Sequence, residues 1–304
     1  MKIAITGFTG FVGQNLARYL SDIDVLGISR KAKGINITYS ELSRNIFNEQ
    51  KVFIHLAGKA HDFKKTSDDA AYFEVNTNLT KRLFDQFSES DCEVFIYMSS
   101  VKAAADSVEG VLTEDVIPNP ITVYGKSKLA AEEYILSRKN LKDKRVYILR
   151  PCMIHGPGNK GNLNLLYNLV SKRIPWILGA FQNKRSYCSI DNLLFIINEL
   201  IENNTIPSGV FNVADDDYLS TNEIISLISN SNNQKPIIFN LSPFIVKFIA
   251  KIGDIIPLPL NSERLKKLTE SYMVSNEKLK KYIAKELPLT SKQGITKTLS
   301  SFKT

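Results

Sequence analysis

The feature that most constrains the fold is a glycine-spaced turn close to the start of the chain. Residues 6–13 read Thr-Gly-Phe-Thr-Gly-Phe-Val-Gly, so glycine recurs at every third position as Gly7, Gly10 and Gly13. The turn follows a β-branched run at 2–6 and opens a stretch with helical spacing at 11–20. The first glycine permits a tight turn, the second lets the backbone approach a pyrophosphate, and the third allows close packing of helix on strand. Because a helix N-terminus attracts phosphate, the turn predicts a dinucleotide site rather than a purely structural bend.

The first half of the chain alternates strand-like and helix-like patterns. Short apolar runs predict strands at 2–6, 24–29, 51–56, 93–98 and 145–149, and helical spacing predicts long helices at about 68–87 and 122–137. Near-continuous apolar strands separated by helices indicate a parallel sheet covered on both faces. The sequence therefore predicts an α/β fold with a Rossmann-like, doubly wound parallel sheet.

The pattern loosens after Pro151, where Gly- and Asn-rich loops and short helices take over. We predict a dinucleotide-binding domain over 1–160, to which the segment 186–215 returns by adding a strand at 209–213. The rest of 161–304 is predicted to be mainly a smaller substrate-binding lobe. Its helices are expected near 221–229, 243–251 and 275–282.

Composition narrows the class of protein and its partners. The 304 residues carry a net charge of +8, which favours an anionic ligand or reflects a lysine-rich surface. The basic residues are scattered without interleaved aromatics, so we expect a phosphorylated small molecule rather than nucleic acid. No apolar run is long enough for a membrane span. The longest, 243–260, is interrupted by charges and predicts a buried amphipathic helix, with a membrane-surface helix as the alternative.

The cysteines and the N-terminus indicate a compartment. Cys92, Cys152 and Cys188 are odd in number and widely spaced, which argues against disulfides and against a zinc site. We expect no metal. The chain enters its first strand without a secretory-type apolar segment, and we expect a cytoplasmic protein.

The end of the second predicted strand bears on the cofactor. Ser29, Arg30 and Lys31 lie about 20 residues past the glycine turn, where the adenosine ribose is recognised. A carboxylate there would bind the 2′-hydroxyl of NAD, whereas basic residues suit the 2′-phosphate of NADP. Asp24 comes too early in the strand to play that part. The sequence favours NADP over NAD, although a solvated basic pair at a strand end would look the same.

A tyrosine and a lysine carry the predicted chemistry. Of 12 tyrosines, only Tyr124 has a lysine four residues on, Lys128, and these positions are neighbours on a helix. An ammonium beside a phenol favours the phenolate and lowers its pKa, so Tyr124 is a candidate proton donor and acceptor at a nicotinamide site. The preceding strand ends in Ser99 and Ser100, whose hydroxyls either bind the same substrate oxygen or serve the turn.

Together these pieces resemble the extended short-chain dehydrogenase/reductase family, in particular its nucleotide-sugar epimerase and reductase branch. The resemblance rests on these segments: the glycine turn 6–13, His55-Leu56-Ala57-Gly58, Asn76 within 75–78, Ser99-Ser100, Tyr124-x-x-x-Lys128, Leu149-Arg150-Pro151, Gly156-Pro157-Gly158, Arg185-Ser186-Tyr187 and Ile190-Asp191-Asn192. One departure is the run 101–105, Val-Lys-Ala-Ala-Ala, where many members have Val-Tyr-Gly soon after the serine pair. The other is the basic pair at 30–31, in place of the acidic residue of epimerases that retain NAD.

The resemblance implies roles for individual residues. Tyr124 would be the acid/base, Lys128 would hold the nicotinamide ribose, and Ser100 would bind the reacting oxygen. Substrate diphosphate would meet Asn162, Arg185 and, more weakly, Arg264; for Arg185 the alternative is an ordinary ion pair. The cofactor would contact Gly7, Gly10, Phe11, Val12, Gly13, Ser29, Arg30, Lys31, Leu56, Ala57, Gly58, Asn76, Ser99, Tyr124, Lys128, Pro151 and Met153.

The resemblance also implies a choice of reactions. One is NADPH-dependent reduction of the C4 keto group of a UDP-linked 6-deoxy-N-acetylhexosulose for surface polysaccharide, which the basic pair at 30–31 favours. The other is NAD-dependent 4-epimerisation of a UDP-sugar. A non-catalytic NADP-sensing protein is a remote third, because such proteins typically lose the Tyr or the Lys. The family pairs two long helices across a homodimer interface, for which 68–87 and 122–137 are the candidates.

Overall fold

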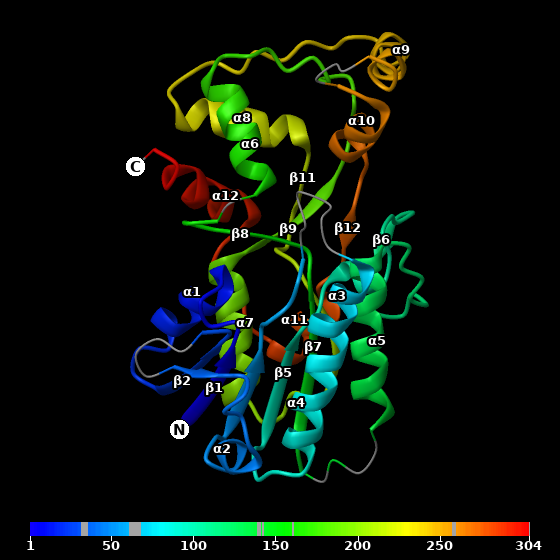
Figure 1. Ribbon diagram of the computed structural model, residues 1–304. Coiled ribbons are helices and arrows are strands. Elements are labelled where there is room, and N and C mark those ends of the chain that lie inside the picture. The colour runs from blue at the N-terminus through cyan, green and yellow to red at the C-terminus, as the bar shows by residue number, and fades with distance from the viewer. Residues whose placement is uncertain are drawn as a thin grey trace.

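The computed structural model describes residues 1–31, 36–60, 68–138, 141, 143–159, 161–256 and 260–303. It confirms the predicted α/β fold class (Figure 1). Within the described residues, seven parallel strands form one sheet in the order β10-β7-β5-β4-β1-β2-β3. These strands are β1 (Lys2–Thr6), β2 (Asp24–Ser29), β3 (Ile37–Thr38), β4 (Val52–His55), β5 (Val94–Met98), β7 (Arg145–Pro151) and β10 (Gly209–Val213).

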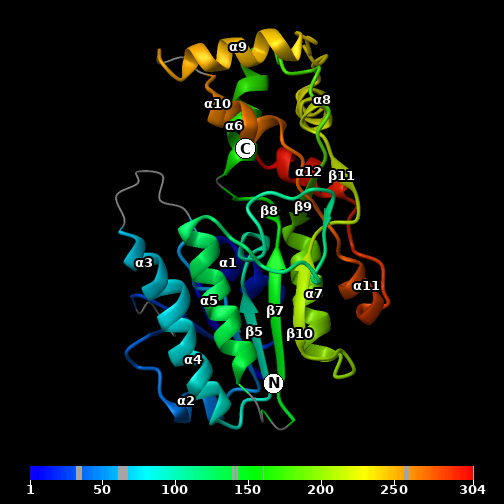
Figure 2. The ribbon, with the colours of Figure 1, turned by 90° about the vertical axis from the view of Figure 1, so that its right-hand side faces the viewer.

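Helices cover both faces of this sheet (Figures 1 and 2). One face packs against α1 (Phe11–Tyr19) and α7 (Ile190–Glu202), and the other against α2 (Arg44–Asn48), α4 (Leu79–Ser88) and α5 (Val123–Ser137). Successive side chains of a strand point to opposite faces, so Ile3 and Ile5 join the first core and Ala4 the second. Because both faces are buried, the strands read as the continuous apolar runs from which they were predicted.

The second lobe lies beyond the carboxyl ends of the sheet strands (Figure 1). A small sheet, β11 (Tyr218–Leu219), β9 (Arg185–Ser189) and β8 (Met153–His155), supports α6 (Asn162–Ser171), α8 (Thr221–Ser231) and α12 (Ser291–Ser300), with α9 (Pro243–Gly253) and α10 (Ser262–Thr269) at its far end. Two pieces return toward the sheet: β12 (Met273–Val274) pairs with β6 (Val111–Leu112), and α11 (Glu277–Ile283) packs on β10. None of the described helices has the length and apolar character needed to cross a membrane.

The structure confirms several predicted elements and corrects two. The strand at 209–213 joins the sheet beside β7, as expected. The helix predicted over 68–87 is three segments: α3 (Asp69–Phe73), the π-helical turn η1 (Glu74–Asn78) and α4. The helix at 243–251 forms as α9, but it is not buried. Only Val246 and Ala250 of α9 are inside, whereas Phe244 is 80% exposed.

The strand order places the functional site. From β1 the chain runs outward through β2 and β3, and then returns to build β4, β5, β7 and β10 on the other side. The crevice at such a switch point, here between the carboxyl ends of β1 and β4, is where ligands bind in open α/β sheets. The glycine turn and the segment 56–58 lie at these two strand ends.

Candidate active site

The glycine turn has the geometry that its sequence predicts. Gly7 adopts φ +67°, and a Cβ there would lie 2.8 Å from the Ala57 backbone nitrogen. A Cβ on Gly13 would lie 2.5 Å from the Gly7 carbonyl oxygen, which also accepts the Gly10 amide at 2.9 Å. Only glycine fits at Gly7 and Gly13, and α1 begins at Phe11 with its first amides directed at the turn. The residues present therefore fit a bound pyrophosphate.

Ser29, Arg30 and Lys31 lie at the carboxyl end of β2, on the side of the glycine turn away from β4. The buried Ser29 hydroxyl donates to the Lys31 carbonyl at 2.6 Å. Arg30 and Lys31 are exposed, and neither forms an ion pair with any residue that the structure describes. Asp24 lies at the opposite end of the strand, beside Lys2. The carboxyl end of β2, where the adenosine ribose was predicted to bind, thus carries two cations.

Two residues at this end were missed from the sequence. Burial raises the pKa of Tyr39, while hydrogen bonds with Gly7 and Thr6 and the charge of Arg30 lower it, which places its hydroxyl at the glycine turn. The Asn36 side-chain oxygen is buried with no hydrogen-bond partner in the described part of the chain. A Cβ on Gly27 would lie 2.1 Å from that oxygen. Neither residue belongs to a recognisable motif, so only the fold reveals their position.

The segment after β4 joins the glycine turn to the catalytic helix. Ala57 donates its amide to the Thr6 hydroxyl at 3.2 Å, and Leu56 packs against the core. Gly58 is exposed, and a Cβ there would lie 3.0 Å from the Lys128 ammonium nitrogen and 3.2 Å from the Asn76 side-chain oxygen. A cofactor in this crevice would therefore pass over Gly58 toward Lys128.

Asn76 lies inside the π-helical turn η1 and is completely buried. Its side-chain oxygen accepts the Lys59 amide at 2.7 Å, and its side-chain nitrogen donates to the Lys59 carbonyl at 3.0 Å and to the Ser127 hydroxyl at 2.9 Å. The Ser127 hydroxyl in turn donates to the Tyr124 carbonyl at 2.9 Å. Such π turns occur mainly at functional sites, and here the turn ties α5 to the segment after β4.

Tyr124 lies in the first turn of α5, where its hydroxyl is hydrogen-bonded with the Ser100 side chain. The Thr122 hydroxyl caps α5 by accepting the Gly125 amide, and Ser100 lies two residues after β5 ends at Met98. Burial raises the pKa of Tyr124, and a side-chain hydrogen bond with Ser100 lowers it by less. The sequence predicted that Lys128 lowers this pKa, which is wrong for this structure: the neighbours that act on Tyr124 are Ser100 and Tyr72.

The reason lies in the position of Lys128. Its buried ammonium donates to the Met98 carbonyl at 2.8 Å and lies 4.8 Å from the centre of the Tyr97 ring. Desolvation lowers its pKa from 10.5 to about 8, against the opposing effect of Glu132. Spacing along α5 correctly puts the two side chains on one face, but it does not show which polar atoms compete for the ammonium.

The two serines of the pair point to different partners. The Ser99 hydroxyl donates to Glu132, which is fully buried and forms a bidentate ion pair with Arg150. Ser100, in contrast, is the serine beside Tyr124. Tyr124, Lys128 and Glu132 follow one another at four-residue intervals and so share one face of α5. The Glu132–Arg150 pair fixes this face against the end of β7.

Pro151 and Met153, which were predicted to contact the cofactor, lie at the end of β7 and the start of β8. The structure disperses the residues predicted for the substrate diphosphate. Asn162 is an exposed first residue of α6, and Arg264 is exposed on α10. Arg185 is partly buried; it donates to the Lys267 carbonyl at 3.0 Å and pairs with Glu270 at 3.6 Å. The ion pair raised as the alternative for Arg185 is therefore present, and it lies next to α10.

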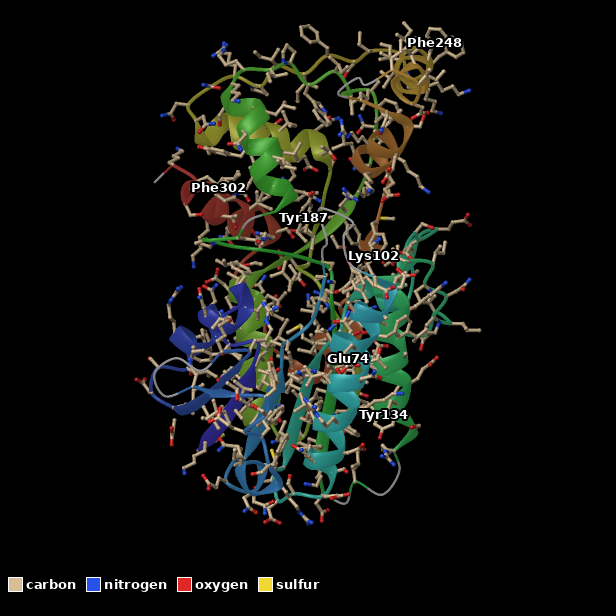
Figure 3. The ribbon with its side chains drawn as sticks, in the orientation of Figure 1. Glu74, Lys102, Tyr134, Tyr187, Phe248 and Phe302 are labelled. Carbon is tan, nitrogen blue, oxygen red and sulfur yellow. The ribbon has the colours of Figure 1, made fainter. Side chains whose placement is uncertain are left out.

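Lys102 is a further residue that the sequence did not assign. It follows Ser100 by two positions and lies between the two lobes (Figure 3). Its ammonium donates to the Asp106 carbonyl at 2.7 Å and lies 4.3 Å from the centre of the Tyr272 ring. Desolvation lowers the pKa of Lys102; the charges of Asp106 and Glu270 raise it, and that of Arg185 lowers it. Lys102 thus places a second cation between Ser100 and Arg185.

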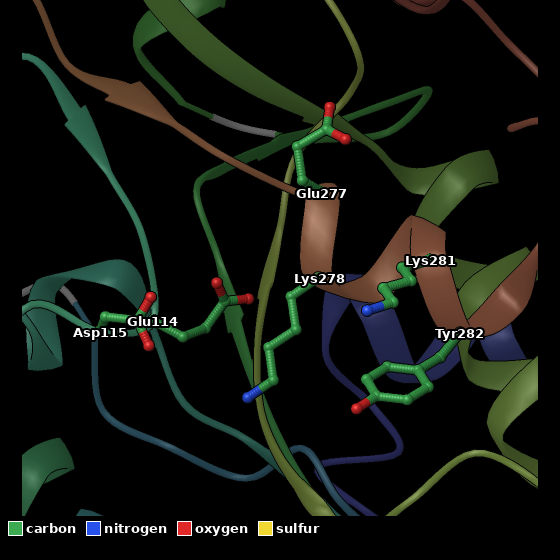
Figure 4. A pocket seen from close by; sticks show the side chains of 6 residues that line it. All are labelled: Glu114, Asp115, Glu277, Lys278, Lys281 and Tyr282. Atoms are coloured by element: carbon green, nitrogen blue, oxygen red, sulfur yellow. The ribbon is translucent and has the colours of Figure 1, made fainter.

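A separate hollow of about 570 Å³ lies between the segment after β6 and α11 (Figure 4). Its lining is charged, and two of its side chains already serve the fold: Glu114 accepts the Asn212 amide, and Lys278 donates to the Val210 carbonyl. None of the residues around Tyr124 lines it. Elsewhere, the three cysteines are buried free thiols, and the described residues contain no cluster of His, Cys, Asp or Glu suited to a metal.

The arrangement combines a phosphate-binding turn with a hydroxyl pair and an ammonium at the end of the same crevice. A phenol and a serine hydroxyl on one substrate oxygen can move a proton while hydride is exchanged with a nicotinamide. The fold and the site together are those of a nicotinamide-dependent enzyme of the Rossmann type.

Comparison with known proteins agrees with that class. Residues 3–214 match the model of the NAD dependent epimerase/dehydratase family. The chain is 30% identical to a Vibrio cholerae UDP-glucose 4-epimerase over 99% of this chain and 95% of the relative. An Escherichia coli O157:H7 relative, an N-acetyl-alpha-D-glucosaminyl-diphospho-ditrans,octacis-undecaprenol 4-epimerase, is 24% identical over 98% and 94%. A Bacillus cereus UDP-glucuronic acid 4-epimerase, solved with UDP-glucuronic acid and NAD, has a TM-score of 0.77 at 19% identity, covering 100% and 99%.

The chain belongs to the NAD dependent epimerase/dehydratase family, within the extended short-chain dehydrogenases/reductases. The resemblance drawn from the motifs is confirmed. The protein is a nicotinamide-dependent enzyme of the nucleotide-sugar epimerase/dehydratase type.

Proposed function

We propose that this enzyme reduces the C4 keto group of a UDP-linked 4-keto-6-deoxy-N-acetylhexosamine with NADPH, in the synthesis of a surface-polysaccharide sugar. The observation that supports a reductase is the exposed cation pair Arg30 and Lys31 at the end of β2, which forms no ion pair with a carboxylate of the described residues. A reductase consumes its reductant and must exchange it at every turnover. Basic residues at the ribose suit the 2′-phosphate of NADPH.

The proposed roles follow from the contacts around α5. When bound, NADPH would supply the hydride for C4. Tyr124 donates its hydroxyl proton to the C4 oxygen, and Ser100 donates a hydrogen bond to the same oxygen. Lys128, whose ammonium lies beside Gly58, would hold the nicotinamide ribose, and Asn76 holds α5 in register through Ser127. On the substrate side, Arg185 and Lys102 supply the positive charge for the diphosphate, with Asn162 and Arg264 at its outer end.

The second candidate is a 4-epimerase that keeps its NAD. The Vibrio cholerae relative, a UDP-glucose 4-epimerase, favours it. A non-catalytic sensing role is disfavoured because Tyr124, Lys128 and Ser100 are all present and grouped. The E. coli relative acts on a sugar carried by a polyprenyl diphosphate. The feature shared with a UDP-sugar is the diphosphate, so both carriers belong in a substrate test.

The test begins with the cofactor that the purified protein carries. A reductase releases or exchanges it, and reduced-nicotinamide absorbance falls when a UDP-linked 4-keto-6-deoxy-N-acetylhexosamine is added. Tyr124→Phe should lower that rate by about 10²-fold or more, and Arg30→Ala/Lys31→Ala should raise the KM for NADPH without changing that for NADH. Retained NAD together with interconversion of UDP-sugars would instead assign the epimerase.

We further propose that residues 1–160 with 186–215 bind the dinucleotide, while the rest of 161–304 mainly binds the sugar nucleotide. The protein is proposed to act in the cytoplasm as a homodimer that pairs the helical segment 68–87 (α3, η1 and α4) and α5 with their symmetry mates. Light scattering on the purified protein checks the dimer.

A further inference from the structure

The far end of the second lobe carries an apolar surface that the proposed reaction does not use. Here, α9-face denotes Phe244, Ile245, Phe248, Ile255 and Ile256, which lie on α9 and the turn just after it. Phe244 is 80% exposed, Phe248 60% and Ile255 87%. Figures 1 and 2 both place α9 at the end of the molecule opposite the N-terminus, and Figure 3 shows Phe248 at the outer edge.

Three rows of side chains run along α9: one buried, one apolar and exposed, and one of lysines. Val246 and Ala250, one turn apart, face inward and anchor α9 to the lobe. Phe244 and Phe248, also one turn apart, face outward. Lys247 and Lys251 form a third row at the same spacing, and both are exposed. With 3.6 residues per turn, the lysines flank the phenylalanines on the solvent side. A row of large apolar residues bordered by lysines is the pattern of a helix that lies in the plane of a membrane surface.

Charge around the α9-face points to an anionic surface. The segment 235–269 contains six basic residues and two acidic ones, so about an eighth of the chain carries half of the net charge of +8. Both acidic residues are engaged: Asp254 accepts hydrogen bonds from Ser262, and Glu263 pairs with Lys267. Six basic residues against two acidic ones leave this segment with a net charge of +4.

These observations favour lipid over a protein partner. The cores of protein interfaces are depleted in lysine, whereas Lys247 and Lys251 directly flank the apolar side chains of the α9-face. It is also a convex helix at the tip of the molecule rather than a groove. We propose that the α9-face binds the surface of an anionic phospholipid bilayer, with the phenylalanines and isoleucines at the level of the acyl-chain boundary and Lys247 and Lys251 among the headgroups.

The experiment is flotation of the full chain with vesicles of phosphatidylglycerol and phosphatidylcholine, or of phosphatidylcholine alone. The protein is expected to float with the anionic vesicles only. Phe244→Ser/Phe248→Ser should weaken partitioning by on the order of tenfold for each side chain. Lys247→Glu/Lys251→Glu should weaken it by roughly fivefold or more for each lysine, and added salt should do the same. Ile117→Ser/Leu165→Ser, which removes exposed apolar side chains elsewhere, is the matched control and should float like the unchanged protein.

A fluorescent reporter makes the test independent of folding defects. The single tryptophan, Trp176, is buried, so Phe248→Trp adds a surface probe. Brominated lipid should quench that probe and leave an Ile117→Trp probe unchanged. The proposal is overturned if the unchanged protein ignores anionic vesicles, or if the lysine variant binds them equally well. It is also overturned if Phe244→Ser/Phe248→Ser instead dissolves a self-association of the chain, which would assign the α9-face to a second copy.

Discussion

Replacing Lys128 by methionine should separate stability from activity. The ammonium is buried, and desolvation lowers its pKa from 10.5 to about 8. At about 1.4 kcal/mol per pKa unit, burial disfavours the charged form by about 3 kcal/mol. Lys128→Met removes that penalty with a side chain of similar length. It also leaves the Met98 carbonyl without its donor, which costs about 1–3 kcal/mol, so the net change at pH 7 is small.

The pH dependence of the stability difference between Lys128→Met and the unchanged protein is a more specific test than the difference at pH 7. The pKa of Lys128 is lower in the folded protein than in the unfolded chain, so the unfolded chain binds more protons between pH 8 and 10.5. The stability of the unchanged protein should therefore rise with pH across that window, and the variant should lack this rise. Between pH 7 and pH 9.5 the stability of Lys128→Met relative to the unchanged protein should fall by about 2 kcal/mol.

Urea unfolding of the cofactor-free protein at these two pH values measures the difference. Lys126→Met, on the exposed side of the same helix, is the control and should track the unchanged protein at both. Turnover of Lys128→Met should fall by about 10²-fold or more. Parallel stability curves for Lys128→Met and the unchanged protein would refute the argument, because they would mean that the ammonium is not desolvated.

Three further predictions concern neighbouring groups. His55 is buried between threonines, and its pKa is lowered from 6.5 to about 3. The unfolded chain therefore binds more protons between these pH values, and the protein loses stability as the pH falls through them. In urea unfolding, His55→Gln should reduce the loss of stability between pH 7.5 and 4.5 by about 3 kcal/mol. Glu132→Gln should destabilise by about 3–5 kcal/mol by leaving Arg150 buried and unpaired, and Glu132→Met/Arg150→Met by much less, as thermal unfolding would show. Lys102→Met should raise the KM for the sugar substrate by about tenfold while kcat and NADPH affinity stay within a few-fold, and an equal loss in all three would indicate a structural role instead.

Much of the nucleotide-binding half was predictable because its signals are local. Strands such as β1 and β2 are buried on both faces and read as apolar runs, and their predicted bounds coincide with those observed. The glycine turn can be recognised in the sequence because Gly7 and Gly13 have no room for a Cβ and must therefore be glycine. Residues four apart share a face on any helix, so the placement of Tyr124 and Lys128 on one face required only that the segment be helical, as α5 is.

What the sequence missed depends on contacts between distant segments. The π turn around Asn76 changes hydrogen bonding within a helix without changing its composition. The Lys128 ammonium donates to the Met98 carbonyl, 30 residues earlier in the chain, and its charge is not among the causes that shift the pKa of Tyr124. In α9, an apolar stripe looks the same whether the chain itself covers it or not. Contacts with the rest of the lobe decide that Val246 is buried and Phe244 is exposed.

The choice between reductase and epimerase turns on the adenosine end of the crevice rather than on Tyr124. Both reactions need the same proton donor, so the grouping of Tyr124 with Ser100 cannot separate them. They differ in whether the cofactor leaves. Arg30 and Lys31 are exposed, and contacts with exposed charges weaken as salt screens them. A cofactor bound through them should exchange faster at high ionic strength, whereas one retained by buried groups such as Asn36 should not. Cofactor release measured against salt therefore discriminates between the two reactions before any substrate is known.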